Sequence, residues 1–365
     1  MLAARFLGGG RVAVEERPVP EPRPGEVLVR VGACALCGSD RAAFRDGSPV
    51  TPGHETAGEV AAVGQGVTGV GVGARGVVYL VDYCGSCAAC RHGWTNVCLA
   101  RRRMYGFDAP GGLAEYQAVA AHCFLPVDPR LPADLATTLL DLFGTTAHAL
   151  RRVGLAVAGG VRGTPEGCPG GSGGVRGTPG CPAESGGALV ASLAVLGCGP
   201  VGLGALAVAG ALGVPERYGV DLVDRRLAMA ERLGAVPVDA GAGDPVAAVR
   251  ARRPDGCDVV VEAAGRATTQ RQAIELAGPG GRVAIVAHSA EPLELRTSAD
   301  LIRREVSLVG AEYFPVAELA ANAELVAAGR LDPTPLVTDR FPLVEVEQAY
   351  HAFWSGRTGK VVVTP

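Results

Sequence analysis

Lysine is almost absent from this 365-residue chain, in which Lys360 is the only one and arginine supplies every other strongly basic side chain. Schiff-base chemistry on lysine is therefore excluded everywhere except at Lys360. The formal net charge is −3, so the chain lacks the basic surface that a nucleic-acid partner requires. It also lacks an uninterrupted apolar run of the roughly 18–20 residues that a membrane span needs, and Met1–Arg5 leads into no long apolar leader. We therefore expect a cytoplasmic protein that binds neither nucleic acid nor membrane.

The apolar pattern changes along the chain, and a chain of this length fits two domains. Between Arg11 and about Val127, short apolar runs cut by Gly and Pro indicate β-strands. From about Leu193, strands alternate with Ala- and Leu-rich helical stretches, which predicts βαβ units around a parallel sheet. The strands predicted in this half are 193–196, 218–222, 258–261, 282–287 and 306–309, with helices such as 201–212 and 225–233. After about Ala311 we expect helices near 316–328 and 344–354 and a strand at 360–363.

A tandem repeat lies between the two halves. Residues 159–169 recur almost letter for letter at 173–182, with much Gly and Pro and few large apolar side chains. Such a segment cannot bury enough surface to offset the entropy of ordering it, so we predict a mobile surface loop. The alternative is that Cys168 and Cys181 form a metal or redox pair.

Four of the eleven cysteines are closely spaced: Cys84, Cys87, Cys90 and, after seven residues, Cys98. In a cytosolic chain, clustered thiols hold metal more often than they form disulfides. Four thiolates fill the tetrahedral shell of Zn²⁺, so the zinc predicted here is structural. The alternatives are four reduced bystander cysteines or a redox cluster.

Two more motifs precede this cluster: Cys37-Gly38-Ser39-Asp40 and Gly53-His54-Glu55. Together with the four cysteines and a later Gly-rich turn, in this order, they resemble the zinc-containing medium-chain dehydrogenases, a family that includes alcohol, polyol and threonine dehydrogenases. The resemblance extends from about Val12 to Val363, apart from the repeat. It implies an α/β plus β fold, in which a GroES-like β-rich catalytic domain, residues 1–150 and 312–365, carries an inserted Rossmann domain with a doubly wound parallel sheet, residues 151–311, and a low-complexity insert at 159–187.

The resemblance also implies a catalytic zinc bound by Cys37 and His54, with Asp141 as the third ligand. One thiolate, one neutral imidazole and one carboxylate neutralise Zn²⁺ and leave it a Lewis acid. The carboxylate places the chain nearer the polyol and threonine enzymes than the two-cysteine alcohol dehydrogenases. Glu55 is either a transient fourth ligand or, as we prefer, a support behind the ligands, and Asp40 is expected to orient the ring of His54.

Ser39 matches the hydroxyl with which the family removes the proton from the substrate oxygen. Many members carry a histidine five residues after the zinc cysteine to pass this proton outward. That position is Ala42 here, so the cofactor ribose with water or another side chain must complete the path. Phe44 and Phe143 are pocket candidates from their positions alone.

The Gly-rich turn is Gly197-Cys198-Gly199-Pro200-Val201-Gly202, which follows a predicted strand and opens a predicted helix, as dinucleotide binding requires. Its glycines allow the backbone N–H groups to approach a pyrophosphate at the helix N-terminus. Asp221 ends the next strand, about 20 residues on, where a carboxylate accepts ribose hydroxyls and repels a 2′-phosphate. The predicted cofactor is therefore NAD, bound by Gly197, Gly199, Pro200, Val201, Gly202 and Asp221. Arg225 and Arg226 are expected to weaken the preference for NAD over NADP. Asp224 is the alternative to Asp221 as the carboxylate that contacts the ribose.

Together these features predict an enzyme with two zinc ions per subunit that moves a hydride between NAD and a secondary alcohol or its ketone. The small-molecule substrate is expected to be a polyol, sugar, aminocyclitol or 3-hydroxy amino acid. Relatives pair through the last Rossmann strand, here 306–309, so we expect a homodimer or homotetramer. Three alternatives stay open: a zinc-free quinone or enoyl reductase of the same superfamily, a non-catalytic interaction protein on this fold, and a zinc-binding nucleic-acid module.

Overall fold

The computed structural model describes residues 1–155 and 190–365. The predicted repeat loop and its two cysteines, Cys168 and Cys181, lie outside the described residues. Among the helices that are described, none is long and apolar enough to cross a membrane.

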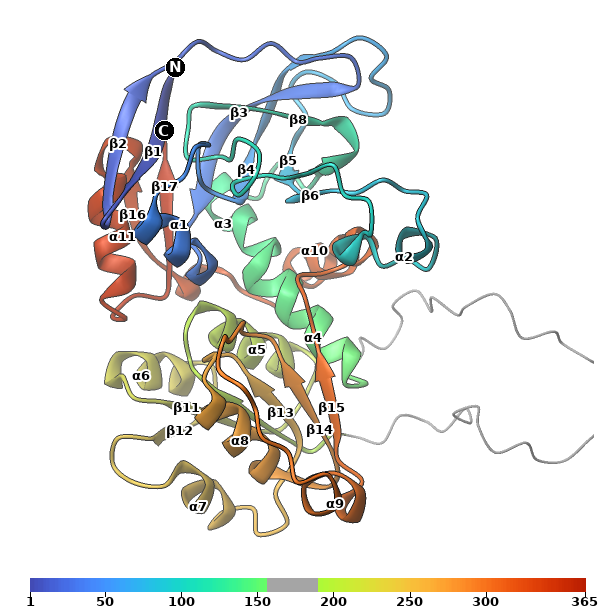
Figure 1. The fold of residues 1–365 in the computed structure, drawn as a ribbon, viewed down its shortest axis with the longest axis vertical. Helices are drawn as coiled ribbons and strands as arrows, with labels where there is room; N and C mark the ends of the chain where they lie inside the picture. Colours follow the sequence, from blue (N-terminus) through green and yellow to red (C-terminus); the bar gives the residue numbers. More distant parts are fainter. Residues whose placement is uncertain (156–189) are drawn as a thin grey trace, which may run out of the picture.

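The β-rich half is built on a seven-stranded, mostly antiparallel sheet that joins segments from far apart in the sequence (Figure 1). Its order is β16-β17-β3-β4-β5-β9, and β8 pairs with β3. Because β17 lies between β16 and β3, a strand near residue 360 is integral to a sheet that begins near residue 26. The strands are β3 (Glu26–Ala35), β4 (Glu55–Val63), β5 (Arg75–Val78), β8 (Tyr116–Ala120), β9 (Phe124–Pro126), β16 (Val337–Pro342) and β17 (Lys360–Thr364).

Smaller elements surround this sheet. A hairpin packs beside α11, and a two-stranded ribbon begins the lobe that carries the four cysteines. The hairpin is β1 (Leu2–Gly8) and β2 (Arg11–Glu16), the ribbon is β6 (Val81–Asp82) and β7 (Arg103–Met104), and the helices are α1 (Arg41–Asp46), α2 (Ala88–Arg91), α3 (Ala133–Ala136), α10 (Leu319–Ala327) and α11 (Val346–Trp354).

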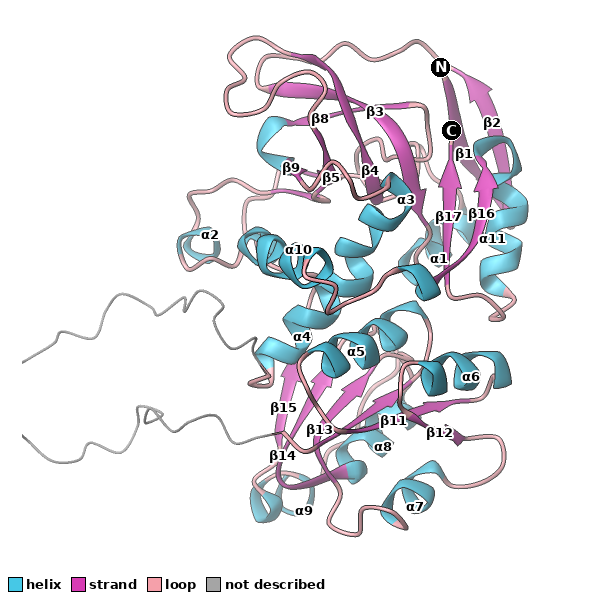
Figure 2. Cartoon of the chain, turned by 180° about the vertical axis from the view of Figure 1, so that it is seen from behind, coloured by secondary structure: helices cyan, strands magenta, loops and turns pink. Residues whose placement is uncertain are grey.

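The other half is a six-stranded parallel sheet of order β12-β11-β10-β13-β14-β15. Counted from β10 this is the order 3-2-1-4-5-6 of dinucleotide-binding sheets. Helices α5 and α6 cover one face, and α7 and α8 cover the other (Figures 1 and 2). The strands are β10 (Ser192–Leu196), β11 (Glu216–Asp221), β12 (Val236–Asp239), β13 (Cys257–Glu262), β14 (Ala277–Ile285) and β15 (Ser307–Gly310), and the helices are α5 (Pro200–Ala211), α6 (Asp224–Arg232), α7 (Pro245–Arg250), α8 (Ala267–Leu276) and α9 (Thr297–Asp300).

The predicted fold class is thus confirmed, and the predicted strands fall within a few residues of those observed. Strand β12 was not predicted, and β14 starts at Ala277 and not at Arg282. Its first residues, Ala-Gly-Pro-Gly-Gly, are typical of a loop and not of a strand. They pair with β13 only at Cys257 and Ala277, before a register shift, so the proline occupies a position that donates no ladder hydrogen bond.

The two halves are joined by α4 (Thr146–Arg152), which passes from the β-rich half to the Rossmann sheet (Figure 1). One hydrophobic core runs through the junction. It includes Val29 of β3, Leu142 of the turn before α4, and Leu206 of α5. Gly204 of α5 faces the turn before α4 so closely that a Cβ there would lie 2.2 Å from the backbone oxygen of Leu142. The nucleotide-binding helix and the segment that carries Asp141 are therefore in direct contact.

Candidate active site

Three of the predicted metal ligands converge where β3, β4 and a π-helical turn meet. Cys37 follows β3, His54 immediately precedes β4, and Asp141 opens the π-helical turn Asp141–Thr145. Oδ2 of Asp141 lies 3.1 Å from Sγ of Cys37 and 3.1 Å from Nε2 of His54. Together with Glu55, the ligand atoms of this group all lie within 4.8 Å of one another. The structure thus brings together residues that are 104 positions apart in the chain.

The ring of His54 is held from its other side by Asp40, as predicted. Nδ1 of His54 lies 3.2 Å from Oδ1 of Asp40, and both side chains are 2% exposed. The second oxygen of Asp40 accepts a hydrogen bond of 2.9 Å from the Tyr350 hydroxyl and one of 3.2 Å from the Cys37 backbone. Sequence reasoning missed Tyr350, which comes from α11 and is brought to the site only by the long-range packing of the fold. Asp40 therefore fixes a histidine and a cysteine of the cluster at once.

Ser39 is exposed, and its hydroxyl lies 3.4 Å from Nε2 of His54. Ala42 lies on α1, shortly after Ser39 in the sequence. The pocket candidate Phe44 packs instead in a core cluster, with its ring centroid 5.0 Å from Tyr350 and 5.6 Å from Phe6. Phe143 is fully buried in the main core. Neither phenylalanine is available as a pocket residue, because each is needed to fill a core.

Glu55 is fully buried behind the cluster and forms an ion pair with Lys360 of β17. Its other oxygen, Oε2, has no hydrogen-bond partner among the described residues. Burial acts to raise the pKa of Glu55, and the positive charge of Lys360 opposes this. Sequence reasoning did not pair these residues. The available signal was a solitary lysine at the head of an otherwise apolar strand, Lys-Val-Val-Val.

The chemistry of the donor set fits a divalent cation. Burial and the Asp141 carboxylate raise the pKa of the Cys37 thiol. Burial acts to raise the pKa of Asp141 as well, but His54 holds that pKa well below its usual range. A buried thiolate beside a buried carboxylate is unfavourable without a nearby positive charge. One sulfur, one nitrogen and one carboxylate oxygen at these separations form a donor set that Zn²⁺ binds in catalytic sites.

The four-cysteine lobe has the dimensions of a closed zinc site. The Sγ atoms of Cys84 and Cys90 are 4.0 Å apart, and those of Cys87 and Cys98 are 3.8 Å apart. Zn–S bonds of about 2.3 Å give tetrahedral S···S edges of about 3.8 Å. Backbone N–H groups of Ser86 and Cys87 point at Sγ of Cys84 and lower its pKa to about 6, which favours the thiolate that a metal needs.

A third group with possible metal-binding atoms is Asp82, His122 and Cys123. Here Asp82 accepts a hydrogen bond of 2.8 Å from Arg103 and lies 3.1 Å from His122. Burial raises the pKa of Cys123 far above its usual range, so it stays a thiol. With an arginine already in contact with the carboxylate, this group is a structural ion pair at the base of the lobe and not a metal site.

The Gly-rich turn adopts the conformation expected for nucleotide binding. A Cβ on Gly202 would lie 1.8 Å from the backbone oxygen of Gly197, so the helix approaches the turn as closely as glycine allows. Gly199 is the N-cap of α5, Pro200 is its first residue, and the space in front of Gly199 is open. The free N–H groups and positive end of α5 therefore face an accessible volume.

Asp221 ends β11 beside this turn, but its carboxylate is already engaged. One oxygen accepts the backbone N–H of Cys198 at 2.7 Å, and the other accepts those of Leu222 and Val223 at 2.8 and 2.9 Å. Arg226 lies 3.6 Å away. A carboxylate has about four acceptor positions, so Asp221 orders the turn and keeps acceptor capacity on the side where a ribose is predicted.

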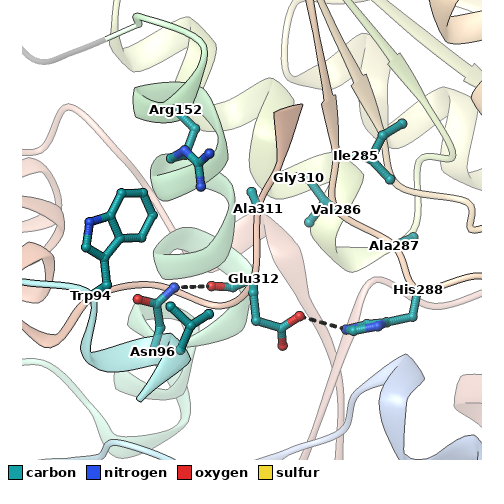
Figure 3. A pocket seen from close by; sticks show the side chains of 11 residues that line it. Trp94, Asn96, Arg152, Ile285, Val286, Ala287, His288, Gly310, Ala311 and Glu312 are labelled. Carbon is teal, nitrogen blue, oxygen red and sulfur yellow. Dashed lines mark hydrogen bonds and ion pairs between the residues drawn. The ribbon is translucent and has the colours of Figure 1, made fainter. Parts of the chain in front are cut away.

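A cavity of about 320 Å³ lies at the carboxyl ends of β14 and β15 (Figure 3). Trp94 and Asn96 of the four-cysteine lobe form one wall, and His288 and Glu312, paired at 3.0 Å, stand at the strand ends opposite. Open α/β sheets bind ligands beyond the carboxyl ends of their strands. None of the cluster residues Cys37, His54 or Asp141 lines the cavity, so it is adjacent space and not the reaction centre itself.

Comparisons with known proteins agree with this geometry. Residues 23–129 match the family model described as alcohol dehydrogenase GroES-like domain, and residues 200–328 match the one described as zinc-binding dehydrogenase. The L-threonine 3-dehydrogenase of Symbiobacterium thermophilum is 31% identical over 385 residues, an alignment that covers 100% of this chain and 98% of that protein.

Solved structures are similar over the same length. The alcohol dehydrogenase of Thermus sp. ATN1 has a TM-score of 0.83 at 29% identity, and the 2R,3R-butanediol dehydrogenase of Bacillus subtilis has 0.81 at 25%. Both alignments cover 100% of this chain and 99% of the other. The chain therefore belongs to the zinc-type medium-chain alcohol dehydrogenase family and is an oxidoreductase that acts on hydroxyl groups.

Proposed function

We propose that the protein is a zinc-dependent, NAD-linked dehydrogenase of secondary alcohols that carry a second polar group. The observation that carries this proposal is the convergence of Cys37 and His54 on Asp141, whose carboxylate lies 3.1 Å from both. The turn that Asp141 opens is in contact with the nucleotide-binding helix α5. The four cysteines of the lobe hold a second, structural zinc.

In this proposal each residue of the cluster has a separate task. Cys37, His54 and Asp141 hold the ion, and Zn²⁺ bound there supplies Lewis-acid polarisation of the substrate oxygen. Asp40 keeps Nε2 of His54 directed at the centre, because it occupies the Nδ1 side of the ring. Glu55, anchored by Lys360, stands behind the ligands and offers its free oxygen to the cluster.

Ser39 removes the proton of the substrate hydroxyl as the hydride leaves. Its hydroxyl is close to His54 and is also exposed, so the proton passes directly to solvent. This arrangement explains why position 42 can be alanine, because an exposed serine needs no histidine to carry the proton on to solvent.

NAD binds along the Gly197–Gly202 turn with its pyrophosphate at the N-terminus of α5. Asp221 takes one ribose hydroxyl and disfavours a 2′-phosphate by charge, while Arg226 beside it weakens that discrimination. NAD is therefore preferred over NADP, without being the sole cofactor accepted.

The relatives indicate the substrate class. One is named for threonine and one for 2,3-butanediol, both of which carry a second polar group on the carbon next to the reacting one. The third ligand, Asp141, is a carboxylate, as we expect for polyol, sugar, aminocyclitol and 3-hydroxy amino acid enzymes.

We also propose that two copies pair through β15. This strand ends the six-stranded sheet, and among residues 1–155 and 190–365 its only strand partner is β14. An edge strand of this kind is a natural surface for pairing with a second, symmetry-related copy.

The test is a screen of NAD and NADP reduction across polyols, amino alcohols, sugars and cyclitols, with zinc measured in the same preparation. Two zinc ions per subunit and reduction of NAD by at least one secondary alcohol support the proposal. A metal-free protein that reduces quinones or enoyl compounds would instead identify a zinc-free reductase, and full zinc loading without any turnover would favour a binding role.

A further inference from the structure

Tyr350 of α11 is held rigidly in the interior of the β-rich half. Its side chain is fully buried, and its ring centroid lies 5.0 Å from that of Phe44 and 5.1 Å from that of Phe6. The ring of Trp354, one turn later on the same helix, stacks against it at 6.1 Å. Because protein interiors are close-packed, a ring enclosed in this way keeps its orientation. The direction of the Tyr350 hydroxyl is therefore set by the aromatic core around it.

This hydroxyl donates a hydrogen bond of 2.9 Å to Oδ2 of Asp40, a residue 310 positions away in the chain. The same oxygen accepts the backbone N–H of Cys37 at 3.2 Å, whereas Oδ1 lies 3.2 Å from Nδ1 of His54. Two donors thus share one oxygen of the carboxylate, and the imidazole faces the other. The hydroxyl helps to fix the rotation of the Asp40 carboxylate so that Oδ1 points at the ring of His54.

The two donors that hold Oδ2 of Asp40 are uncharged, which preserves the effect of this carboxylate on His54. In the described part of the chain, neither an arginine nor a lysine forms an ion pair with Asp40. A guanidinium at this place would draw negative charge away from the imidazole, whereas a hydroxyl and a backbone N–H leave most of that charge facing Nδ1. A carboxylate behind a metal-binding imidazole orients the ring and makes it a stronger donor.

Packing alone does not require the hydroxyl of Tyr350. The side chains that surround its ring belong to an apolar core cluster, in which phenylalanine would fill the same volume without a polar group that needs a partner. Within residues 1–155 and 190–365, the hydroxyl makes its one hydrogen bond to Asp40. What the tyrosine provides beyond a phenylalanine is therefore its contact with this carboxylate.

We propose that Tyr350 is a positioning residue of the catalytic metal centre, which acts through Asp40 to keep His54 directed at the ion. This inference rests on the proposed function, because it concerns the zinc held by Cys37, His54 and Asp141. Without the hydroxyl, Oδ2 of Asp40 is held by one backbone N–H alone, so the carboxylate turns more freely and the His54 ring loses a fixed partner. The C-terminal helix α11 thus helps to retain an ion that Tyr350 does not touch.

The test compares zinc release from Tyr350→Phe and from the wild type, with both sites of each protein loaded. A chelator that changes colour on binding zinc follows the release, and the phase that is missing in Asp141→Asn identifies the catalytic site. In Tyr350→Phe this phase is expected to be about 10- to 100-fold faster. Release from the four-cysteine lobe is expected to be unchanged, so the lobe is an internal control in the same molecule.

Co²⁺ in the catalytic site gives a second measurement that does not depend on activity. Its visible absorption bands report the geometry of the ligands, and they are expected to shift or broaden in Tyr350→Phe. Tyr105→Phe is the matched control, because the Tyr105 hydroxyl is equally buried but accepts a hydrogen bond of 2.8 Å from the backbone of Ala120. This control is expected to change neither zinc release nor the cobalt spectrum.

A double-mutant cycle with Asp40→Asn tests whether Tyr350 acts through Asp40. Asp40→Asn alone is expected to speed release from the catalytic site at least as much as Tyr350→Phe does, because it removes the charge that faces Nδ1. Adding Tyr350→Phe to it should change the rate by no more than about twofold, because the two side chains act as one unit.

Three results would overturn the role of Tyr350 and leave the dehydrogenase assignment in place. They are catalytic-site release in Tyr350→Phe as slow as in the wild type, equal acceleration at both zinc sites, and effects of Tyr350→Phe and Asp40→Asn that multiply in the double variant. A wild-type protein that retains zinc in the four-cysteine lobe alone would overturn the proposed function, and this inference with it.

Discussion

Lys360 and Glu55 form an ion pair in the interior, with 1% and 0% of their side chains exposed. One comes from β17 and the other from β4, with β3 between them in the sheet. Removing one member of such a pair leaves an uncompensated buried charge.

Lys360→Met is expected to lower the free energy of unfolding by about 3–5 kcal/mol, because Glu55 loses its counter-charge. Lys360→Arg retains the charge and is expected to recover most of this loss. Urea denaturation at pH 7 measures both. A methionine variant as stable as the wild type would mean that the pair contributes nothing to the fold.

Asp141→Asn removes the one carboxylate among the three catalytic ligands. The ion is then left with a net positive charge in a buried site, so its affinity falls and kcat is expected to fall at least about 100-fold. Zinc per subunit after dialysis should decrease from two to one, while the Kd for NAD stays within about threefold. Asp128→Asn, which alters a half-exposed carboxylate paired with Arg130 outside the cluster, is the control. Full activity in Asp141→Asn would contradict the ligand assignment.

Much of this centre could be predicted because its residues stand in local motifs. Cys37, His54 and the four lobe cysteines are marked by their spacing, and the Gly197–Gly202 turn by the strand before it and the helix after it. Lys360 and Tyr350 could not be found in this way, because each reaches the site through long-range packing that no local pattern encodes. Asp221 was found by its position, yet its three backbone hydrogen bonds depend on how the turn folds back on β11.

Cys98→Ser is expected to abolish the structural zinc site. Thr95 and Asn96, which belong to the same lobe, hold the segment from Glu312 to Val316. Loss of the metal should therefore speed amide hydrogen exchange by about tenfold or more in both the lobe and this distant segment. Val97→Ala changes a lobe residue that is not a ligand and serves as the control. Faster exchange in the lobe alone would show that the segment does not depend on it.

Asp221→Ser should change the choice of cofactor. The substitution removes the negative charge and the acceptor for Cys198, Leu222 and Val223, so kcat/KM with NAD is expected to fall roughly 10- to 100-fold. With NADP it should rise, because Arg226 is then free to meet a phosphate. Steady-state kinetics with both cofactors provides the measurement. Asp224→Ser tests the alternative carboxylate, and a larger effect there would move the ribose site to Asp224.

Acid stability should depend on Asp300. Hydrogen bonds from Arg271 hold the pKa of Asp300 well below its usual value of 3.8, and Arg296 adds to the effect. Because the pKa of the folded state is depressed, this contribution is complete above about pH 4 and is lost as the pH falls further. Asp300→Asn is expected to cost about 1–3 kcal/mol at pH 7 and progressively less below pH 4. Urea midpoints between pH 7 and pH 3 check this, and a pH-independent difference would refute it.

The position of β17 has a consequence for biosynthesis. While a ribosome is still translating the Rossmann half, the edge of β3 that receives β17 stays open, and Glu55 has no cation beside it. The inserted half has all six of its strands by residue 310 and can fold as soon as it emerges. The half that carries the reaction centre is thus started first and completed last, so chaperone capture of nascent chains is expected to concentrate on its unpaired β3 edge.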